Sequence, residues 1–326
     1  MKVLVTGATG FVGSQVAAAL VRQGHDVRAL LRRTSNTVAL DGQPVEHIYG
    51  DILDPDAVNA AVRGCERVFH VAAVSSYWRA HAADVYRVNV EGTRVVMDAC
   101  LRAGVPRVVH TSSAAAIGMR RDGQPSDETQ LFDPREKRFA YAHSKHLAEE
   151  EVFKAIKLGL PAVIVNPAAV IGPGDHNLIS GSMIVEMAKR PLPACPPGGL
   201  CMVDVDAVVE GHLAAAQRGR PGERYILGGE NLTYREITAI ISDIVGCRAP
   251  GWTVPAWVLP PAAVVLDTVN RLVSRPIASG DQLRTSARSV FFSSDKAVAE
   301  LGFSILPFRR AAERAYSWYL EKGYLS

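Results

Sequence analysis

Short apolar runs alternate with amphipathic helical patterns over the first half of the chain. Six runs are predicted to be buried strands, at residues 1–5, 27–31, 45–49, 67–71, 107–111 and 162–165. Helical patterns lie among them at residues 14–23, 55–62, 85–103 and 142–158. Strands separated by helices predict an α/β fold, a doubly wound parallel sheet with helices on both faces.

The pattern becomes less regular after Asn166. Segments rich in proline and glycine, such as 191–199, alternate with sheet-like pieces at 202–206 and 224–227 that return to the main pattern. We therefore expect a second, smaller domain built from discontinuous segments. The predicted division is a dinucleotide-binding domain of residues 1–165 plus about 201–228, and a C-terminal substrate-binding domain of about 166–200 and 229–326.

The composition is that of a globular protein, with 48% hydrophobic and 21% charged residues among 326. The net charge of +3 and the lack of a dense Lys/Arg run argue against nucleic-acid binding. Five scattered cysteines without a CxxC pair predict no metal site and no disulfide framework, and they favour a reducing compartment. Because the chain begins directly with a strand, we expect no signal peptide and a cytoplasmic location.

The most apolar later stretch, residues 254–273, is interrupted by prolines and by Asp267 and Arg271. It is a poor membrane-spanning helix, so no integral membrane segment is expected. We interpret it as a pocket wall or a helix pair. Superficial membrane contact is the alternative.

Three glycines follow the first strand and precede the first helix, at Gly7, Gly10 and Gly13. This order of strand, glycine-rich turn and helix places backbone N–H groups at a helix N-terminus, where a pyrophosphate binds. A glycine-rich turn without a nucleotide is the alternative. The predicted cofactor contacts in this turn are Gly7, Thr9, Gly10, Phe11, Val12 and Gly13.

The end of the second strand carries Arg32 and Arg33 and no acid. A carboxylate there would bind a ribose 2′-hydroxyl, whereas arginine suits a 2′-phosphate, so NADP(H) is favoured over NAD(H). Solvated surface arginines are the competing interpretation. Asp51 and Ile52 after the third strand are expected to flank the adenine. Ala72 and Ala73 after the fourth leave room for the dinucleotide.

Tyr141 and Lys145 are four residues apart on a predicted helix, so the phenol and the ammonium share a face. A nearby cation stabilises phenolate and is expected to lower the pKa of Tyr141. That makes Tyr141 a candidate proton donor to a carbonyl or acceptor from an alcohol. A chance Tyr-x-x-x-Lys pair is the alternative.

Ser113 follows the strand that begins at Arg107, at the sheet edge where ligands bind. Its hydroxyl could hydrogen-bond a substrate oxygen as charge develops, so we assign Ser113, Tyr141 and Lys145 as catalytic. A serine that only ends a strand is the alternative. The cofactor set is completed by Thr111, Tyr141, Lys145 and Pro167, and the substrate set is Ser75, Trp78, Ser113, Tyr141 and Ala168.

The expected pocket is more hydrophobic than polar and also includes Ile117, Ile171 and Met183. It suits a carbonyl on a fairly apolar body better than a sugar nucleotide, whose diphosphate needs cations. Arg218, Arg220 and Arg224 could bind a substrate phosphate, although a solvated loop is the favoured interpretation.

Motifs along nearly the whole chain resemble the extended short-chain dehydrogenase/reductases, the NAD-dependent epimerase/dehydratase superfamily. They are residues 7–13, 50–51, 70–73, 89–93, 111–113, 141–145, 166–167, 172–173, 225–229 and 291–294. The chain most resembles the dihydroflavonol-reductase-like branch, and within it bacterial hopanoid-associated sugar epimerases. The resemblance implies a Rossmann domain, bound NAD(P)(H), and Ser113, Tyr141 and Lys145 as catalytic residues. It also implies that Asn89 supports the active site and that a homodimer forms through the helices at 85–103 and 142–158.

The function expected from these residues is an NADP(H)-dependent oxidoreductase that interconverts a carbonyl and an alcohol on a small, fairly apolar molecule. An epimerase or dehydratase acting on a sugar or sugar nucleotide is the alternative. A non-catalytic nucleotide-sensing module is a remote one, since such relatives often lose the Tyr/Lys pair.

Overall fold

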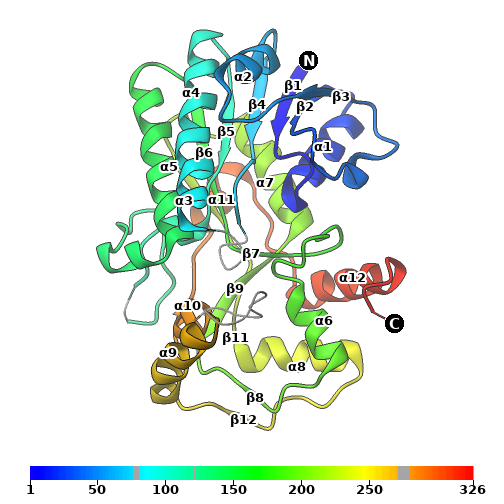
Figure 1. The fold of residues 1–326 in the computed structure, drawn as a ribbon, viewed down its shortest axis with the longest axis vertical. Helices are drawn as coiled ribbons and strands as arrows, with labels where there is room; N and C mark the ends of the chain where they lie inside the picture. Colours follow the sequence, from blue (N-terminus) through cyan, green and yellow to red (C-terminus); the bar gives the residue numbers. More distant parts are fainter. Residues whose placement is uncertain (76–80, 121, 271–279, 326) are drawn as a thin grey trace.

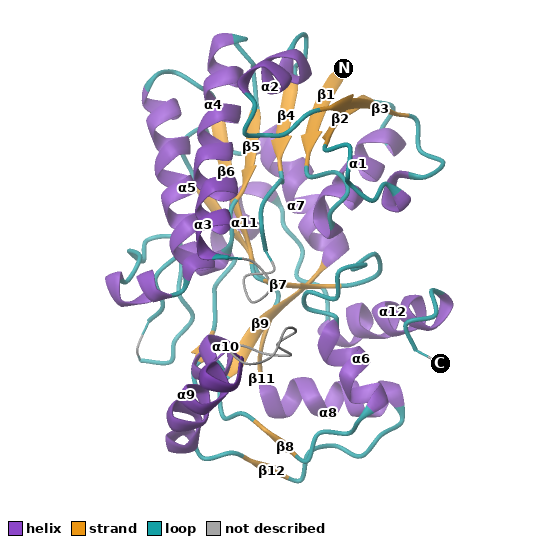
Figure 2. Ribbon diagram, in the orientation of Figure 1, coloured by secondary structure: helices purple, strands orange, loops and turns teal. Residues whose placement is uncertain are grey.

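The computed structural model describes residues 1–75, 81–120, 122–270 and 280–325, and a seven-stranded parallel sheet forms its larger part (Figures 1 and 2). In sheet order the strands are β10 (Arg224–Leu227), β6 (Ala162–Pro167), β5 (Val108–Thr111), β4 (Arg67–His70), β1 (Lys2–Thr6), β2 (Asp26–Leu31) and β3 (Val45–Tyr49). After β3 the chain crosses back to form β4 on the other side of β1, so the first strand lies inside the sheet. The structure confirms the predicted doubly wound sheet.

Alternate residues of each central strand enter two separate cores, one on each face of the sheet. Val3 and Val5 of β1 pack against one group of helices, whereas Leu4 packs against the other. This alternation follows from the two-residue period of a strand, and apolar residues on both sides are typical of a parallel sheet covered on both faces. The first group is α1 (Phe11–Arg22), α7 (Val205–Arg218) and α11 (Asp295–Leu301); the second is α2 (Pro55–Val62), α4 (Gly92–Arg102) and α5 (Ala140–Lys157).

A smaller sheet lies beyond the carboxyl ends of the large one (Figure 2). It consists of β11 (Glu230–Thr233), β9 (Gly199–Asp204), β13 (Ser289–Val290) and β7 (Ala169–Ile171), and a separate two-stranded sheet pairs β12 (Trp252–Thr253) with β8 (Ala194–Cys195). Helices α6 (Ser182–Lys189), α8 (Tyr234–Val245) and α12 (Phe308–Glu321) pack on it around a third core. Two further helices are α9 (Leu259–Asn270) and α10 (Gly280–Thr285), and 3₁₀ segments lie at Val38–Leu40, Ala114–Ala116, Pro134–Arg138 and Ala256–Val258.

Two predicted elements differ from the structure. The piece expected at 202–206 to return to the main sheet is β9 of the smaller sheet, and the chain rejoins the large sheet through α7 and β10. The predicted helix at 85–103 is divided into α3 (Ala82–Tyr86), a π-helical turn (Arg87–Glu91) and α4. The division into two functional domains remains a prediction.

None of the helices in the described ranges is both long and apolar enough to cross a membrane.

The turn between β1 and α1 depends on a close backbone contact. Gly7 has a φ of +72°, the left-handed conformation that glycine adopts without strain. A Cβ on Gly13 would lie 2.1 Å from the Gly7 carbonyl oxygen, so α1 approaches β1 as closely as it does only because Gly13 has no side chain. Glycine at these two positions therefore has a direct geometric cause.

We expect Gly13→Ala to lower the free energy of unfolding by about 1–3 kcal/mol, because backbone must move to accept the methyl group. Gly251→Ala is the matched control, since a Cβ there meets nothing within 4 Å, and its change should stay within about 0.5 kcal/mol. Urea denaturation of both variants measures the difference. Equal stabilities would show that the turn has room for a side chain.

Candidate active site

A cavity of about 1010 Å³ is lined both by the carboxyl edge of the large sheet and by the smaller sheet. Gly7 follows β1, Arg32 follows β2, Ala72 follows β4 and Ser113 follows β5, and all four line the cavity. In open α/β sheets this edge is where ligands bind. The cavity is therefore the candidate active site.

Most of the residues predicted from the sequence line this one cavity. They are Gly7, Thr9, Gly10, Phe11, Val12, Gly13, Arg32, Asp51, Ile52, Ala72, Ala73, Ser75, Thr111, Ser113, Tyr141, Lys145, Pro167 and Ala168. Ile117 and Met183 also line it, whereas Ile171 is buried in the core beneath the smaller sheet. Trp78 lies outside the described residues. The structure thus brings most of the predicted residues together in one cavity.

The glycine-rich turn has the shape that a dinucleotide requires. Helix α1 begins after its N-cap residue, Gly10. Because glycine has no side chain, no side-chain hydrogen bond caps the first turn. The first N–H groups of a helix need acceptors, and phosphate oxygens can supply them. A Cβ on Gly7 would lie 2.6 Å from the backbone nitrogen of Ala72, so the turn and the end of β4 are in close contact. These residues fit a bound NAD(P)(H).

The two arginines after β2 have different surroundings. Arg32 lines the cavity next to Ser35. Arg33 has its guanidinium carbon 5.3 Å from the centre of the Tyr49 ring, a cation–π contact on the surface of β3. Arg32 is therefore the arginine placed to meet a ligand in the cavity, and Ser35 is a neighbour that the sequence analysis missed.

Ser113 and Tyr141 are hydrogen-bonded to each other at the cavity wall. Ser113 starts a 3₁₀ turn after β5, and its hydroxyl accepts a hydrogen bond from the Ala115 N–H (3.2 Å). Burial raises the pKa of Tyr141, and the hydrogen bond to Ser113 opposes that rise. The expected lowering of this pKa is therefore wrong, because desolvation of the phenol dominates. Tyr141 keeps its proton at neutral pH.

Lys145 lies one turn after Tyr141 on α5 and is 2% exposed. Its Nζ donates a hydrogen bond to the Thr111 carbonyl oxygen (2.7 Å). Burial lowers the pKa of Lys145 to about 8. Burial and the Lys145 charge also lower the pKa of His70 to about 3, and that of His110 well below its usual range. Both histidines are therefore neutral beside the ammonium.

A buried carboxylate, Glu149, supports Lys145 from the next turn of α5. Glu149 is 1% exposed, and its charge raises the pKa of Lys145 against the effect of burial. Its Oε1 accepts a hydrogen bond from Asn166 Nδ2 (2.6 Å), and its Oε2 pairs with Arg224 Nη1 (3.3 Å). Asn166 Nδ2 also donates to the Ser113 carbonyl oxygen (3.0 Å). Glu149 thus connects Lys145 with the backbone that carries Ser113.

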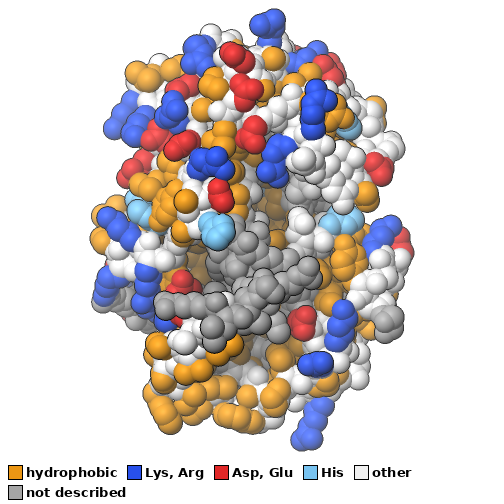
Figure 3. Space-filling view, viewed as in Figure 1, with side chains coloured by type: hydrophobic (Ala, Val, Ile, Leu, Met, Phe, Trp, Pro, Cys, Tyr) orange, Lys and Arg blue, Asp and Glu red, His pale blue; other side chains and the backbone are white. Residues whose placement is uncertain are grey.

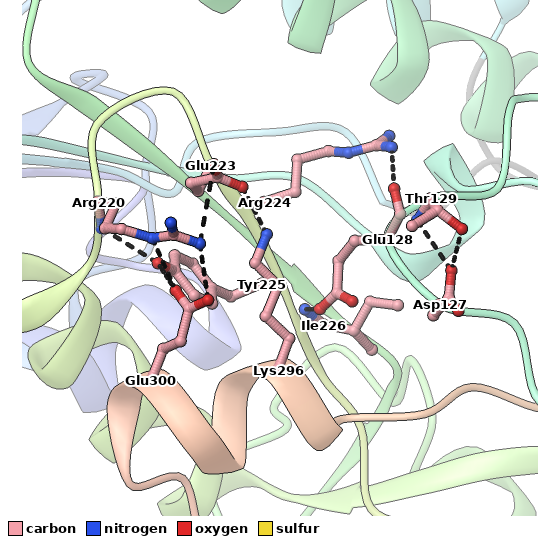
Figure 4. A network of polar contacts seen from close by, with 10 residues as sticks. All are labelled: Asp127, Glu128, Thr129, Arg220, Glu223, Arg224, Tyr225, Ile226, Lys296 and Glu300. Atoms are coloured by element: carbon pink, nitrogen blue, oxygen red, sulfur yellow. Dashed lines mark hydrogen bonds and ion pairs between the residues drawn. The ribbon is translucent and has the colours of Figure 1, made fainter.

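The arginines considered for a substrate phosphate have structural partners instead. Arg224 donates to the Glu128 carbonyl oxygen, and Arg220 Nη2 pairs with Glu300 Oε1 (2.7 Å) (Figure 4). Arg218 donates to the Leu301 carbonyl oxygen. These arginines are absent from the cavity lining in the described part of the chain. Arg218 ends α7 and Arg220 lies in the loop that follows, and both are exposed, as the solvated-loop interpretation expects. Arg224 of β10 is half-buried.

A second polar chain connects β1, β4 and the π-helical turn. Thr93 Oγ1 donates to the Asn89 carbonyl oxygen (2.6 Å), so it must accept from His70 Nε2 (3.0 Å). His70 is neutral, and its Nδ1 therefore accepts from Thr6 Oγ1 (2.8 Å). That same hydroxyl accepts from the Ala72 N–H (3.3 Å). One chain of hydrogen bonds thus orders the end of β4 beside the cofactor turn.

Asn89 lies in the π-helical turn and holds the backbone that follows β4. Its Oδ1 accepts from the Val74 N–H (2.7 Å), and its Nδ2 donates to Ser144 Oγ (3.0 Å) on α5. The extra residue of a π turn changes the direction of neighbouring side chains, and such turns are frequent at functional sites. Asn89 thus holds Val74 and Ser144 at the same time, and we attribute this to the direction that the π turn gives its side chain.

Sequence analysis missed the residues that the smaller sheet and the C-terminal helices contribute to the cavity. They are Leu200, Cys201, Met202, Tyr234, Asp281, Gln282, Thr285, Val290 and Phe292, together with Glu136, Arg138, Phe139 and Asn177 from other segments. Phe292 lies in the motif at 291–294, which gave it no place in the cavity, and no motif marks the others, because they reach the cavity only through the packing of distant segments. The apolar run at 200–203 was the one visible signal.

The model of the NAD dependent epimerase/dehydratase family matches residues 3–228. The chain belongs to this family. The match covers the large sheet, the glycine-rich turn and the Ser113, Tyr141 and Lys145 cluster. Membership also makes the chain an NAD(P)-dependent enzyme of the extended short-chain dehydrogenase/reductase type.

Full-length relatives in this family differ in their named activities. A protein of Synechocystis sp. named "Putative dihydroflavonol 4-reductase" is 40% identical over 98% of this chain and 95% of its own length. "Sterol demethylase protein B" of Methylococcus capsulatus is 35% identical over 99% of both chains. The crystal structure of DesIV, a dTDP-glucose 4,6-dehydratase from Streptomyces venezuelae with NAD and TYD bound, has a TM-score of 0.79 at 25% identity, covering 100% of this chain and 99% of the other.

Proposed function

We propose that this enzyme is an NADP(H)-dependent oxidoreductase that interconverts a carbonyl and an alcohol on a small, fairly apolar substrate. One observation carries the proposal. The hydrogen-bonded pair of Ser113 and Tyr141 faces a cavity that the smaller sheet and the residues next to it line with the apolar side chains of Leu200, Met202, Val290 and Phe292. We call this part of the cavity the substrate end. A named reductase among the relatives is consistent with it.

In the proposed reaction, bound NADPH supplies the hydride. Ser113 and Tyr141 would hydrogen-bond the substrate oxygen, and Tyr141 would give that oxygen its proton. The raised pKa of Tyr141 favours reduction, because the phenol carries a proton at neutral pH. The Lys145 ammonium would stabilise the phenolate that remains, and it would hydrogen-bond the cofactor ribose.

The cations along the cavity distinguish this proposal from a sugar-nucleotide epimerase or dehydratase. In the described part of the lining they are Arg32, Arg138 and Lys145. Arg32 and Lys145 belong to the proposed cofactor half. Arg138 is exposed, with its guanidinium carbon 4.7 Å from the centre of the Phe139 ring. Among these described residues a substrate diphosphate would therefore meet one surface arginine, which is poor support for two negative phosphates.

Tyr141→Phe should lower kcat about a hundredfold or more, because it removes the proton donor. NADPH affinity should change little, since the ring remains. Tyr86→Phe is the matched control, because the Tyr86 hydroxyl bonds His143 Nδ1 (2.9 Å) away from the cavity. Steady-state kinetics with a panel of ketones and fluorescence titration with NADPH measure both effects. Full turnover by Tyr141→Phe would exclude the proposed role.

Arg32→Ala should weaken NADPH binding about tenfold or more and leave NADH binding unchanged, because hydrogen bonds to a charged group contribute about 1.5–3 kcal/mol. Arg33→Ala, which removes the contact with Tyr49, should preserve the preference for NADPH over NADH. Titration of the wild type and both variants with each nucleotide makes the comparison. Purified protein that retains NAD through dialysis would instead favour the epimerase or dehydratase.

The kcat/KM for carbonyl reduction should fall as pH rises through about 8, because Lys145 loses its charge there. Glu149→Gln removes the charge that raises this pKa, so the fall should move to lower pH. Glu150→Gln, on the exposed side of the same helix, should leave it in place. Profiles of all three proteins test this directly. The same profile for Glu149→Gln and wild type would show that Lys145 titrates independently of Glu149.

A further inference from the structure

One end of the molecule exposes large apolar side chains. Trp257 is 77% exposed, Val265 63%, Trp252 59%, Val264 58% and Val269 48%. We call these five residues the α9 patch. Figure 3 shows hydrophobic side chains gathered at this end, which Figure 1 identifies as α9 and the neighbouring β12 segment. Monomeric proteins seldom expose such neighbouring apolar residues without a partner.

Helix α9 is apolar on both of its faces. Leu259 and Ala263 face inward and are 4% and 0% exposed. Val264, Val265 and Val269 face outward. A helix on the surface of a water-exposed domain normally carries polar residues on its outer face, and a helix that is hydrophobic all round is buried in protein or lipid. The outer face of α9 therefore requires a covering that the chain itself does not provide in its described residues.

The charges around the α9 patch indicate what covers it. Residues 249–270 contain one charged side chain, Asp267. It is turned toward α10, where it accepts from the Gly280 N–H (2.9 Å) and pairs with Arg284 Nη2 (2.8 Å). The patch therefore has no free carboxylate. Arg248, the residue that precedes this stretch, is exposed and has no acidic partner in the described part of the structure.

The patch forms the outside of a cavity wall. Helix α9 packs against α10, and Asp281, Gln282 and Thr285 of α10 line the cavity. A surface that covered the α9 patch would thus lie next to the substrate end of the cavity. This placement holds whichever carbonyl or sugar the enzyme uses.

We propose that the α9 patch docks on the surface of a lipid bilayer that contains anionic phospholipid. The valines would enter the acyl boundary, the two tryptophans would lie at the headgroup level, and Arg248 would meet lipid phosphate. Charge complementarity favours this partner over a second copy of the chain. A symmetric copy would present another Arg248 and again no free carboxylate.

Cosedimentation with vesicles tests the proposal. Wild-type protein should bind vesicles of phosphatidylcholine with phosphatidylglycerol more strongly than vesicles of phosphatidylcholine alone. The double variant Trp257→Ser, Val265→Ser should have a vesicle partition coefficient more than tenfold lower than that of the wild type, because both apolar contacts are removed. Leu158→Ser is the matched control, since Leu158 is 70% exposed at the end of α5, and it should bind as wild type does. Arg248→Gln should lower binding to the anionic vesicles about fivefold.

NADPH titration and thermal unfolding of each variant show that the fold and the cofactor site are intact, so a failed active-site assignment cannot be mistaken for failed docking. Quenching of wild-type tryptophan fluorescence by brominated lipids should be strong, and it gives a second result that needs no variant. Absence of vesicle binding by the wild type overturns the proposal. A dimer in solution that the double variant abolishes, without vesicle binding, would assign the patch to a subunit interface instead.

Discussion

All seven strands of the large sheet run in one direction, and the position of the site follows from that constraint. Their carboxyl ends meet at one edge, so residues that are far apart in sequence become neighbours there. Gly7, Ala72 and Ser113 each follow a different strand and line the same cavity. The smaller sheet forms the other wall of the cavity, facing this edge. Cofactor and substrate regions are thus produced by strand direction before any particular side chain is considered.

The cluster of Ser113, Tyr141 and Lys145 contains a cation that is buried but has polar partners. Lys145 is almost fully enclosed, which lowers its pKa, and removing water from a charge costs free energy unless partners replace it. The Thr111 carbonyl and the Glu149 carboxylate supply that replacement, and Arg224 in turn balances Glu149. The ion pair between Arg224 and Glu149 therefore supports the candidate site, although neither residue is among the described residues that line the cavity.

The parts of the site that were predictable from sequence are those encoded by local spacing. The glycine-rich turn and the pair Tyr141 and Lys145 have fixed separations within one turn or one helix, so their geometry could be expected. The sign of the pKa shift at Tyr141 could not, because it depends on how deeply the folded chain buries the phenol. The positions of Phe292 and Tyr234 in the cavity were not predicted for a similar reason, because packing between distant segments puts them there. The strand at β9 was recognised, but its partner sheet was not, because a short apolar run does not reveal what it pairs with.

The π-helical turn at Arg87–Glu91 fixes the number of residues in this segment more strictly than an ordinary helix would. A π turn holds one residue more than a regular α-helical turn, so losing one residue here would restore regular winding and change the direction of the side chains within the turn. Asn89 could then no longer hold Val74 and Ser144 at the same time. Insertions and deletions, which most helices absorb at their ends, are therefore excluded from this turn as long as the loop after β4 must be held beside α5.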